Sequence, residues 1–156
     1  MVYDNEMNID LRTNTAYLDI FYFREREQKV LTQEILPNQN GIKFVVDQIN
    51  LTQHIVEDII KPKVIIVKNK ESSAYWGKFA DKDIIWMGYD LEFVENTITG
   101  ELFRIKGLID SQERIAPEIK SSNIENTLVL FTQHINQYTK REKRPTAKFI
   151  KELLAK

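Results

Sequence analysis

The sequence predicts one α/β domain over residues 1–156, a three-layer α/β/α arrangement with a short, mainly parallel central sheet and an inserted β-hairpin. Two runs, KVIIV at Lys63–Val67 and TLVLFT at Thr127–Thr132, are continuously apolar, as strands covered on both faces are. Before the first run, apolar residues recur at helical spacing over residues 41–60. A hydrophobic fraction of 42% and a charged fraction of 29% are typical of a globular protein with its own core.

The N-terminal elements follow from shorter patterns. Ala16–Phe23 (AYLDIFYF) is rich in aromatic and β-branched residues and predicts a further buried strand, which Asp19 interrupts. Glu27–Leu36 predicts a short helix that stops at the following proline. The long helix begins at Gly41, and Pro62 limits it because the residue before a proline disfavours the helical conformation.

The C-terminal two thirds alternate between strands and polar segments. Ser72–Ala80 predicts a short helix or an ordered loop. Ile84–Val94 and Glu101–Leu108 alternate apolar and polar residues and are joined by NTITG, which predicts the β-hairpin. Asp110–Asn126 is polar and predicts a loop, and Pro145 suits the first turn of a closing helix.

Composition excludes several classes of function. The net charge is -1, so any electrostatic preference for nucleic acid must be local. The absence of cysteine excludes disulfides, thiolate metal sites and a cysteine nucleophile. The chain has two histidines and no glycine-rich phosphate loop or dinucleotide fingerprint, so neither a metal nor a cofactor is expected. No signal peptide begins the chain and no apolar run approaches the about 20 residues of a membrane span, which predicts a cytoplasmic protein with no membrane partner.

Both histidines lie in the tetrapeptide TQHI, which occurs twice. His54 falls beside the apolar face of the long helix, which predicts a surface or boundary histidine. His134 directly follows TLVLFT and so lies at the carboxyl end of a buried strand, where open α/β sheets bind their ligands. A histidine there can donate a hydrogen bond or move a proton near neutral pH, so His134 is the candidate catalytic residue. The alternative is a histidine that caps the strand and bonds to local backbone.

A basic segment with an aromatic residue at its start follows His134. Tyr138 offers a ring that can stack on a base, and the cations after it can meet phosphates. The candidate nucleic-acid-binding residues are Lys140, Arg141, Lys143 and Arg144. The segment predicts a DNA contact through a local basic loop, and the alternative is a solvated loop before a helix.

The stretch VLFTQHINQYTKREKRPTAKFIKELL resembles the closing segment of the uracil-DNA glycosylase superfamily, in which a buried strand, a DNA-intercalating loop and a final helix follow one another. The resemblance implies an α/β fold and a DNA base glycosylase, a hydrolase of DNA repair that flips a base out of the duplex. It implies that His134 stabilises the developing uracil anion and that Asp19 lies near the base-reading position, so that Asp19 and Tyr138 bind the substrate. Tyr138–Arg144 lies where the family's loop enters DNA.

The chain departs from the family pattern in two places. Ile135-Asn136 follows the histidine where the family has Pro-Ser, and the residues before Arg12 do not contain the family's water-activating loop. The chain is then either the C-terminal part of a larger glycosylase-like fold or a catalytically incomplete relative. A non-catalytic α/β domain that binds nucleic acid or a partner protein is the alternative function. A small-ligand enzyme that uses Asp19 and His134 as a proton-transfer pair is a third hypothesis.

Overall fold

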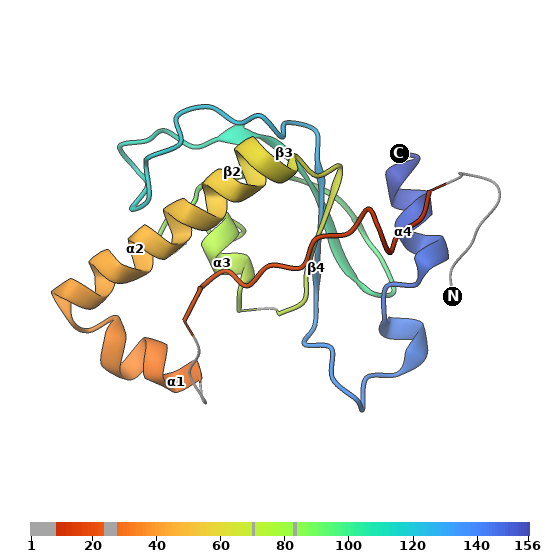
Figure 1. Ribbon diagram of the computed structural model, residues 1–156, viewed down its shortest axis with the longest axis horizontal. Helices are drawn as coiled ribbons and strands as arrows, with labels where there is room; N and C mark the ends of the chain where they lie inside the picture. Colours follow the sequence, from red (N-terminus) through yellow and green to blue (C-terminus); the bar gives the residue numbers. More distant parts are fainter. Residues whose placement is uncertain (1–8, 24–27, 70, 83) are drawn as a thin grey trace.

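The computed structural model describes residues 9–23, 28–69, 71–82 and 84–156, and within them it contains an open sheet of four strands (Figure 1). The strands are β1 (Val64–Val67), β2 (Tyr89–Asn96), β3 (Gly100–Leu108) and β4 (Leu128–Thr132), in the order β1-β4-β3-β2. β1 and β4 pair in parallel, whereas β4 with β3 and β3 with β2 pair antiparallel. The predicted mixed α/β class is confirmed, but the sheet is not mainly parallel. The reason is that β3 pairs directly with β4, so that β2 and β3 supply half of the sheet.

Helices surround this sheet. They are α1 (Gln28–Val30) with the π-helical turn Leu31–Ile35, α2 (Gln39–His54) with its π-helical continuation Ile55–Ile60, α3 (Ser73–Trp76), the 3-10 turn Arg141–Lys143 and α4 (Ala147–Leu154). Asn38 caps α2 by accepting a hydrogen bond from the backbone of Asn40, and Thr146 caps α4 by accepting one from Phe149. The predicted long helix and closing helix are therefore confirmed.

The two faces of the sheet bury different sets of residues, because successive side chains of a strand point to opposite faces. Val67, Val129 and Phe131 pack with Val45 and Ile49 of α2 in one core cluster. The alternate residues of the same strands face the other way and pack against α4, in a second cluster of Val64, Ile66, Leu102, Leu128, Leu130, Phe149 and Leu153. α2 and α4 accordingly lie on opposite sides of β4 (Figure 1).

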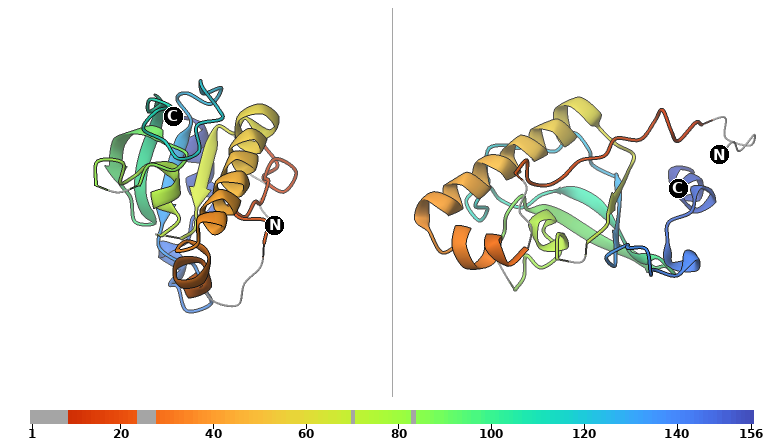
Figure 2. Two further views of the ribbon diagram at one scale, coloured as in Figure 1. Left: turned by 90° about the vertical axis from the view of Figure 1, so that its left-hand side faces the viewer. Right: turned by 60° about the horizontal axis from the view of Figure 1, so that its bottom comes forward.

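The strand predicted at Ala16–Phe23 does not form, and this prediction was wrong. The segment runs outside the sheet from the α4 side of the molecule to α2 (Figure 2). Its backbone bonds go to helix side chains, since the Tyr22 amide donates to Gln48 Oε1 at 2.9 Å and Thr52 Oγ1 donates to the Ile20 carbonyl at 2.7 Å. Its side chains are at most partly buried, with Phe23 packed on Phe44 of α2 and Phe21 on Tyr75 of α3, so the aromatic composition reflects packing on helices rather than pairing with another strand.

The parallel pairing of β1 with β4 places the carboxyl ends of the two strands side by side. Val67 stands opposite Phe131 at the ends of the two strands. The Thr132 hydroxyl donates to the Val67 carbonyl at 3.3 Å, which ties the ends together. The residues that follow the strands, Lys68 and His134, therefore leave the sheet at one edge, which we call the carboxyl edge.

Candidate functional site

The loop between β4 and α4, residues 133–146, begins at the carboxyl edge with a compact turn built on Asn136. Asn136 Oδ1 accepts a hydrogen bond from the Tyr138 amide at 2.9 Å, and its carbonyl accepts one from the Thr139 amide at 3.1 Å. The Thr139 hydroxyl in turn accepts from the Asn136 amide at 3.0 Å. Asn and Thr favour such turns because their short polar side chains bond to nearby backbone. The turn therefore holds residues 136–139 in one conformation.

Arg144 reinforces this turn from the far end of the loop. Its Nε donates to the Thr139 carbonyl at 3.0 Å, and its Nη2 donates to the carbonyls of Asn136 at 3.0 Å and Gln137 at 3.2 Å. The planar guanidinium suits several acceptors at once. Arg144, predicted to bind nucleic acid, is thus half-buried and organises the loop through three backbone carbonyls.

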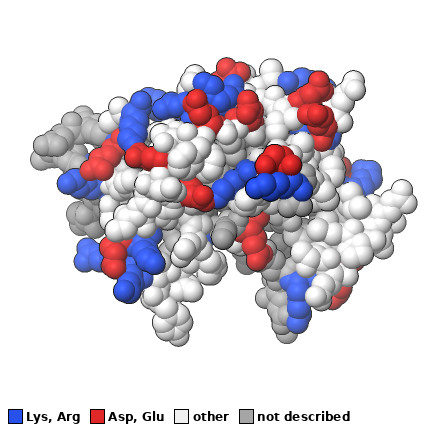
Figure 3. All heavy atoms as spheres, turned by 180° about the vertical axis from the view of Figure 1, so that it is seen from behind, with Lys and Arg blue, Asp and Glu red and all other residues white. Residues whose placement is uncertain are grey.

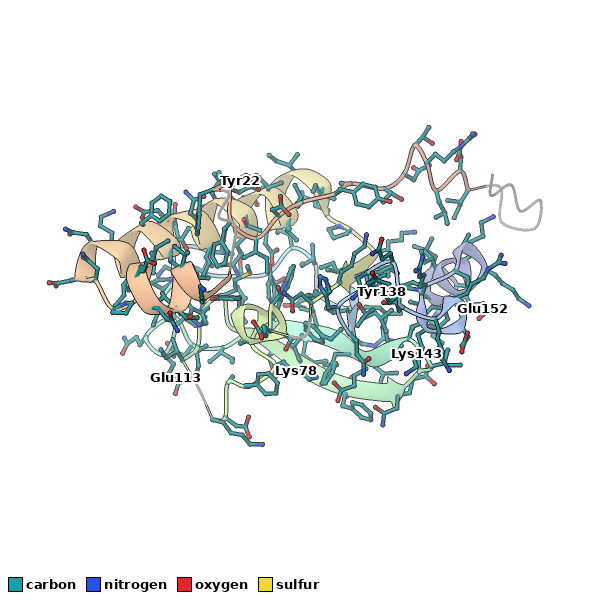
Figure 4. The ribbon with its side chains drawn as sticks, turned by 90° about the horizontal axis from the view of Figure 1, so that it is seen from below. Tyr22, Lys78, Glu113, Tyr138, Lys143 and Glu152 are labelled. Carbon is teal, nitrogen blue, oxygen red and sulfur yellow. The ribbon has the colours of Figure 1, made fainter. Side chains whose placement is uncertain are left out.

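The ordered turn presents Tyr138, which is 83% exposed, with the cations of the loop beyond it. Lys140, Arg141 and Lys143 are exposed, and none of them forms an ion pair with another described residue. Figure 4 views this edge from below and labels Tyr138 and Lys143 on the loop. From behind, the lower edge of the molecule carries an uncharged projection with Lys and Arg side chains beside it (Figure 3).

His134 is exposed where the loop leaves β4. Its carbonyl accepts a hydrogen bond from the Thr139 hydroxyl at 3.4 Å, while its imidazole makes no hydrogen bond or ion pair with another described residue. Asp19 is also exposed, and within the described ranges no such contact joins it to His134. The structure therefore does not assemble Asp19 and His134 as a proton-transfer pair.

A second aromatic and cationic pair lies at the same edge, at residues that the sequence alone did not single out. The Nζ of Lys68, the residue after β1, lies 5.0 Å from the centroid of the Tyr17 ring, and that ring is 80% exposed. The signal that could have found Lys68 is its position after a continuously apolar run, which is the position that singled out His134. A parallel pair of strands places both residues at one edge.

A hollow of about 140 Å³ separates this loop from the turn between β2 and β3. One side of it is formed by residues 97–100 and the other by Gln133, Ile135, Thr139 and Lys143. His134 is not among the residues that line the hollow. The hollow is smaller than the about 300 Å³ at which small-molecule pockets begin. The arrangement therefore favours surface contacts by the loop over enclosure of a ligand beside His134.

Among the residues that the structure describes, no three histidine or carboxylate side chains come together as ligands for a metal ion. No helix in the described ranges is both long and apolar enough to cross a membrane. Comparisons with protein-family models, with curated proteins and with solved structures find no match to this chain. The resemblance to uracil-DNA glycosylases stays a prediction from the sequence.

Proposed function

We propose that this chain is a nucleic-acid-binding domain whose contact surface is the loop between β4 and α4, with Tyr138 stacking on a base and Lys140, Arg141 and Lys143 meeting phosphates. The observation that carries the proposal is the clamp of Arg144 on three carbonyls, which orders the backbone on both sides of a tyrosine that is 83% exposed. An aromatic ring beside cations is the combination that binds single-stranded nucleic acid without a sequence code. Preorganisation of the loop lowers the entropy that binding costs.

The local charge supports the same function. Residues 138–144 carry four cations and one carboxylate, a local charge of +3 in a chain whose net charge is -1. Lys68 adds a further cation at the carboxyl edge, held beside the exposed Tyr17 ring. Phosphate contacts release counterions, so such a loop gives binding that weakens steeply as salt rises.

The DNA-processing form of this function is a uracil-DNA-glycosylase-like activity that depends on His134. The exposed imidazole at the end of β4 supports it, because a hydrogen-bond donor there could stabilise charge that develops on a base oxygen. In this form the cytoplasmic chain has the three-layer fold of the family with an inserted hairpin. The positions of α2 and α4 on opposite faces of the sheet support that arrangement. A glycosylase also needs a residue that positions the attacking water. The residues described for the loop between β4 and α4 do not include one.

Fluorescence anisotropy with a labelled single-stranded DNA oligonucleotide tests the binding function. We expect log Kd to rise linearly with log salt between 50 and 200 mM, with a slope near 2 for about three phosphate contacts. A triple substitution of Lys140, Arg141 and Lys143 by glutamine should remove most of that slope. Lys120→Gln, an exposed lysine on the loop before β4, is the matched control and should leave it unchanged. Binding that is independent of salt would contradict the proposal.

Incubation with a uracil-containing duplex separates the two forms of the function. Alkali-labile strand breaks that His134→Ala abolishes would establish the glycosylase form. Salt-dependent binding without such breaks would instead establish the non-catalytic form.

A further inference from the structure

A pocket lies at the end of the sheet opposite to the carboxyl edge. It has a volume of about 330 Å³ and lies between residues 61–63, the loop before β4 and the end of α4. This volume is within the range in which proteins bind small molecules. The pocket is separate from the loop on which the proposed function rests.

Four cationic residues from four different segments line this pocket. They are Lys61 at the end of the helix, Lys63 before β1, Arg104 on β3 and Lys156 after α4, and the lining includes one carboxylate, Glu125. Lys61 and Lys63 form no ion pair with another described residue, and Arg104 uses Nη1 on the Asn126 carbonyl at 3.2 Å. Lys156 pairs with Glu95, outside the pocket lining. Like charges gathered in this way repel one another, and a multiply charged anion relieves that repulsion.

Backbone conformation supplies a second, independent observation. Within the described ranges, the non-glycine residues with positive φ are Lys61 at 47° and Asn126 at 70°, and both line this pocket. Lys61 occupies the helix C-cap, where glycine adopts the left-handed conformation without a steric penalty. Backbone strain of this kind persists preferentially where a ligand is bound. The two non-glycine residues with this conformation therefore both point to the pocket as a candidate ligand site.

Part of the pocket surface is apolar. Pro62 and Leu154 are partly exposed there, beside Leu128 and Leu153, which are themselves only 3% and 2% exposed. An inorganic anion would leave Pro62 and Leu154 in contact with water, whereas an apolar group attached to the anion would cover them. The ligand that fits is therefore an organic phosphate, with a doubly charged head for the cations and a compact apolar body for Pro62 and Leu154.

We propose that the pocket between Lys61–Lys63, Asn126 and Leu153 is a binding site for a small organic phosphate. Two-dimensional ¹H–¹⁵N NMR titration of the full chain with phenyl phosphate, inorganic phosphate and phenol tests it. Phenyl phosphate should shift the amides of residues 61, 63 and 123–128 in a saturable way. Inorganic phosphate lacks the apolar body and phenol lacks the charge, so each should bind at least fivefold more weakly.

Substitutions of Lys61 and Lys63 test whether the NMR shifts arise from phenyl phosphate bound in the pocket. Lys61→Gln with Lys63→Gln should weaken phenyl phosphate binding at least tenfold, while the control pair Lys43→Gln with Lys82→Gln, two exposed lysines outside the pocket lining, should leave it within twofold. Lys61→Gly should raise the midpoint of urea denaturation and still weaken binding, because glycine relieves the backbone strain and removes a cation. The proposal is overturned if residues 123–128 do not shift, if phenol or inorganic phosphate binds as tightly as phenyl phosphate, or if the Lys61 and Lys63 substitutions leave the affinity unchanged.

Discussion

His54 and Glu118 connect the end of α2 to the loop before β4, with Nε2 of the histidine 3.1 Å from Oε1 of the glutamate. The other ring nitrogen, Nδ1, lies 2.9 Å from Oδ2 of Asp58, one helical turn further along the chain. The histidine predicted to lie at the surface or boundary of the long helix is therefore half-exposed between two carboxylates. Both contacts favour the protonated ring, so that the pKa of His54 is raised, chiefly by Asp58 and then by Glu118.

This relationship predicts a pH-dependent contribution to stability. Because the folded-state pKa of His54 lies above the unfolded value, the contribution is fully present below the unfolded pKa and is lost as pH rises through the folded pKa. His54→Gln should lower the free energy of unfolding by about 0.5 kcal/mol more at pH 5.5 than at pH 8.5, a small effect because water screens exposed pairs. Urea denaturation at the two pH values measures it, with Lys43→Gln as a surface control. An equal loss at both pH values would show that the ion pairs contribute nothing.

Glu57 anchors the same loop from inside the protein. It is fully buried, and its carboxylate accepts hydrogen bonds from the Ser122 hydroxyl at 2.9 Å and from the Asn123 amide. Glu57→Gln replaces one acceptor oxygen by a donor that faces a donor, so we expect a loss of about 2 kcal/mol of unfolding free energy. Chemical denaturation measures the loss. The exposed Glu118→Gln should cost less than half as much, and similar costs for the two variants would contradict the central role of Glu57.

The sequence predicted the parts of the fold that leave a local pattern in the chain, and it did not predict which strands pair. Full burial on both faces requires a continuously apolar run, so β1 and β4 could be located to within a residue or two. Amino-acid composition does not determine which strand a segment pairs with, and for this reason Ala16–Phe23 was assigned to the sheet. In the structure, the side chains of Gln48 and Thr52 form hydrogen bonds with its backbone instead. The mainly parallel sheet was wrong for the same reason, since no local pattern showed that β3 lies against β4.

The candidate site was predictable in part. Position after a buried strand located His134, and the residue types located an exposed aromatic and basic loop. Charge alone could not show that Arg144 faces three carbonyls of its own loop, because that depends on how the chain folds back. The pocket at the other end of the sheet had no sequence signal, since its cations come from segments that are distant in the chain.

Arg144 and Lys140 should affect nucleic-acid binding in different ways. Arg144→Lys keeps the charge and loses the clamp, so affinity for a single-stranded oligonucleotide should fall about fivefold with little change in the salt slope. Lys140→Gln removes one exposed charge, so the salt slope should fall by about 0.7 while the loop keeps its conformation. Anisotropy titrations from 50 to 200 mM salt separate the two effects. If Arg144→Lys changed only the slope, its role would be a phosphate contact rather than the organisation of the loop.

Tyr138 should contribute to binding through its ring and little to stability. Its side chain is 83% exposed, so Tyr138→Ala should change the unfolding free energy by less than about 0.5 kcal/mol. Loss of a stacked base should weaken oligonucleotide binding by about 1 to 3 kcal/mol, whereas Tyr138→Phe keeps the ring and should remain within twofold of wild type. Tyr22→Ala, an exposed tyrosine beside α2, is the matched control (Figure 4). Equal losses for the phenylalanine and alanine variants at Tyr138 would assign the contact to the hydroxyl group and exclude stacking.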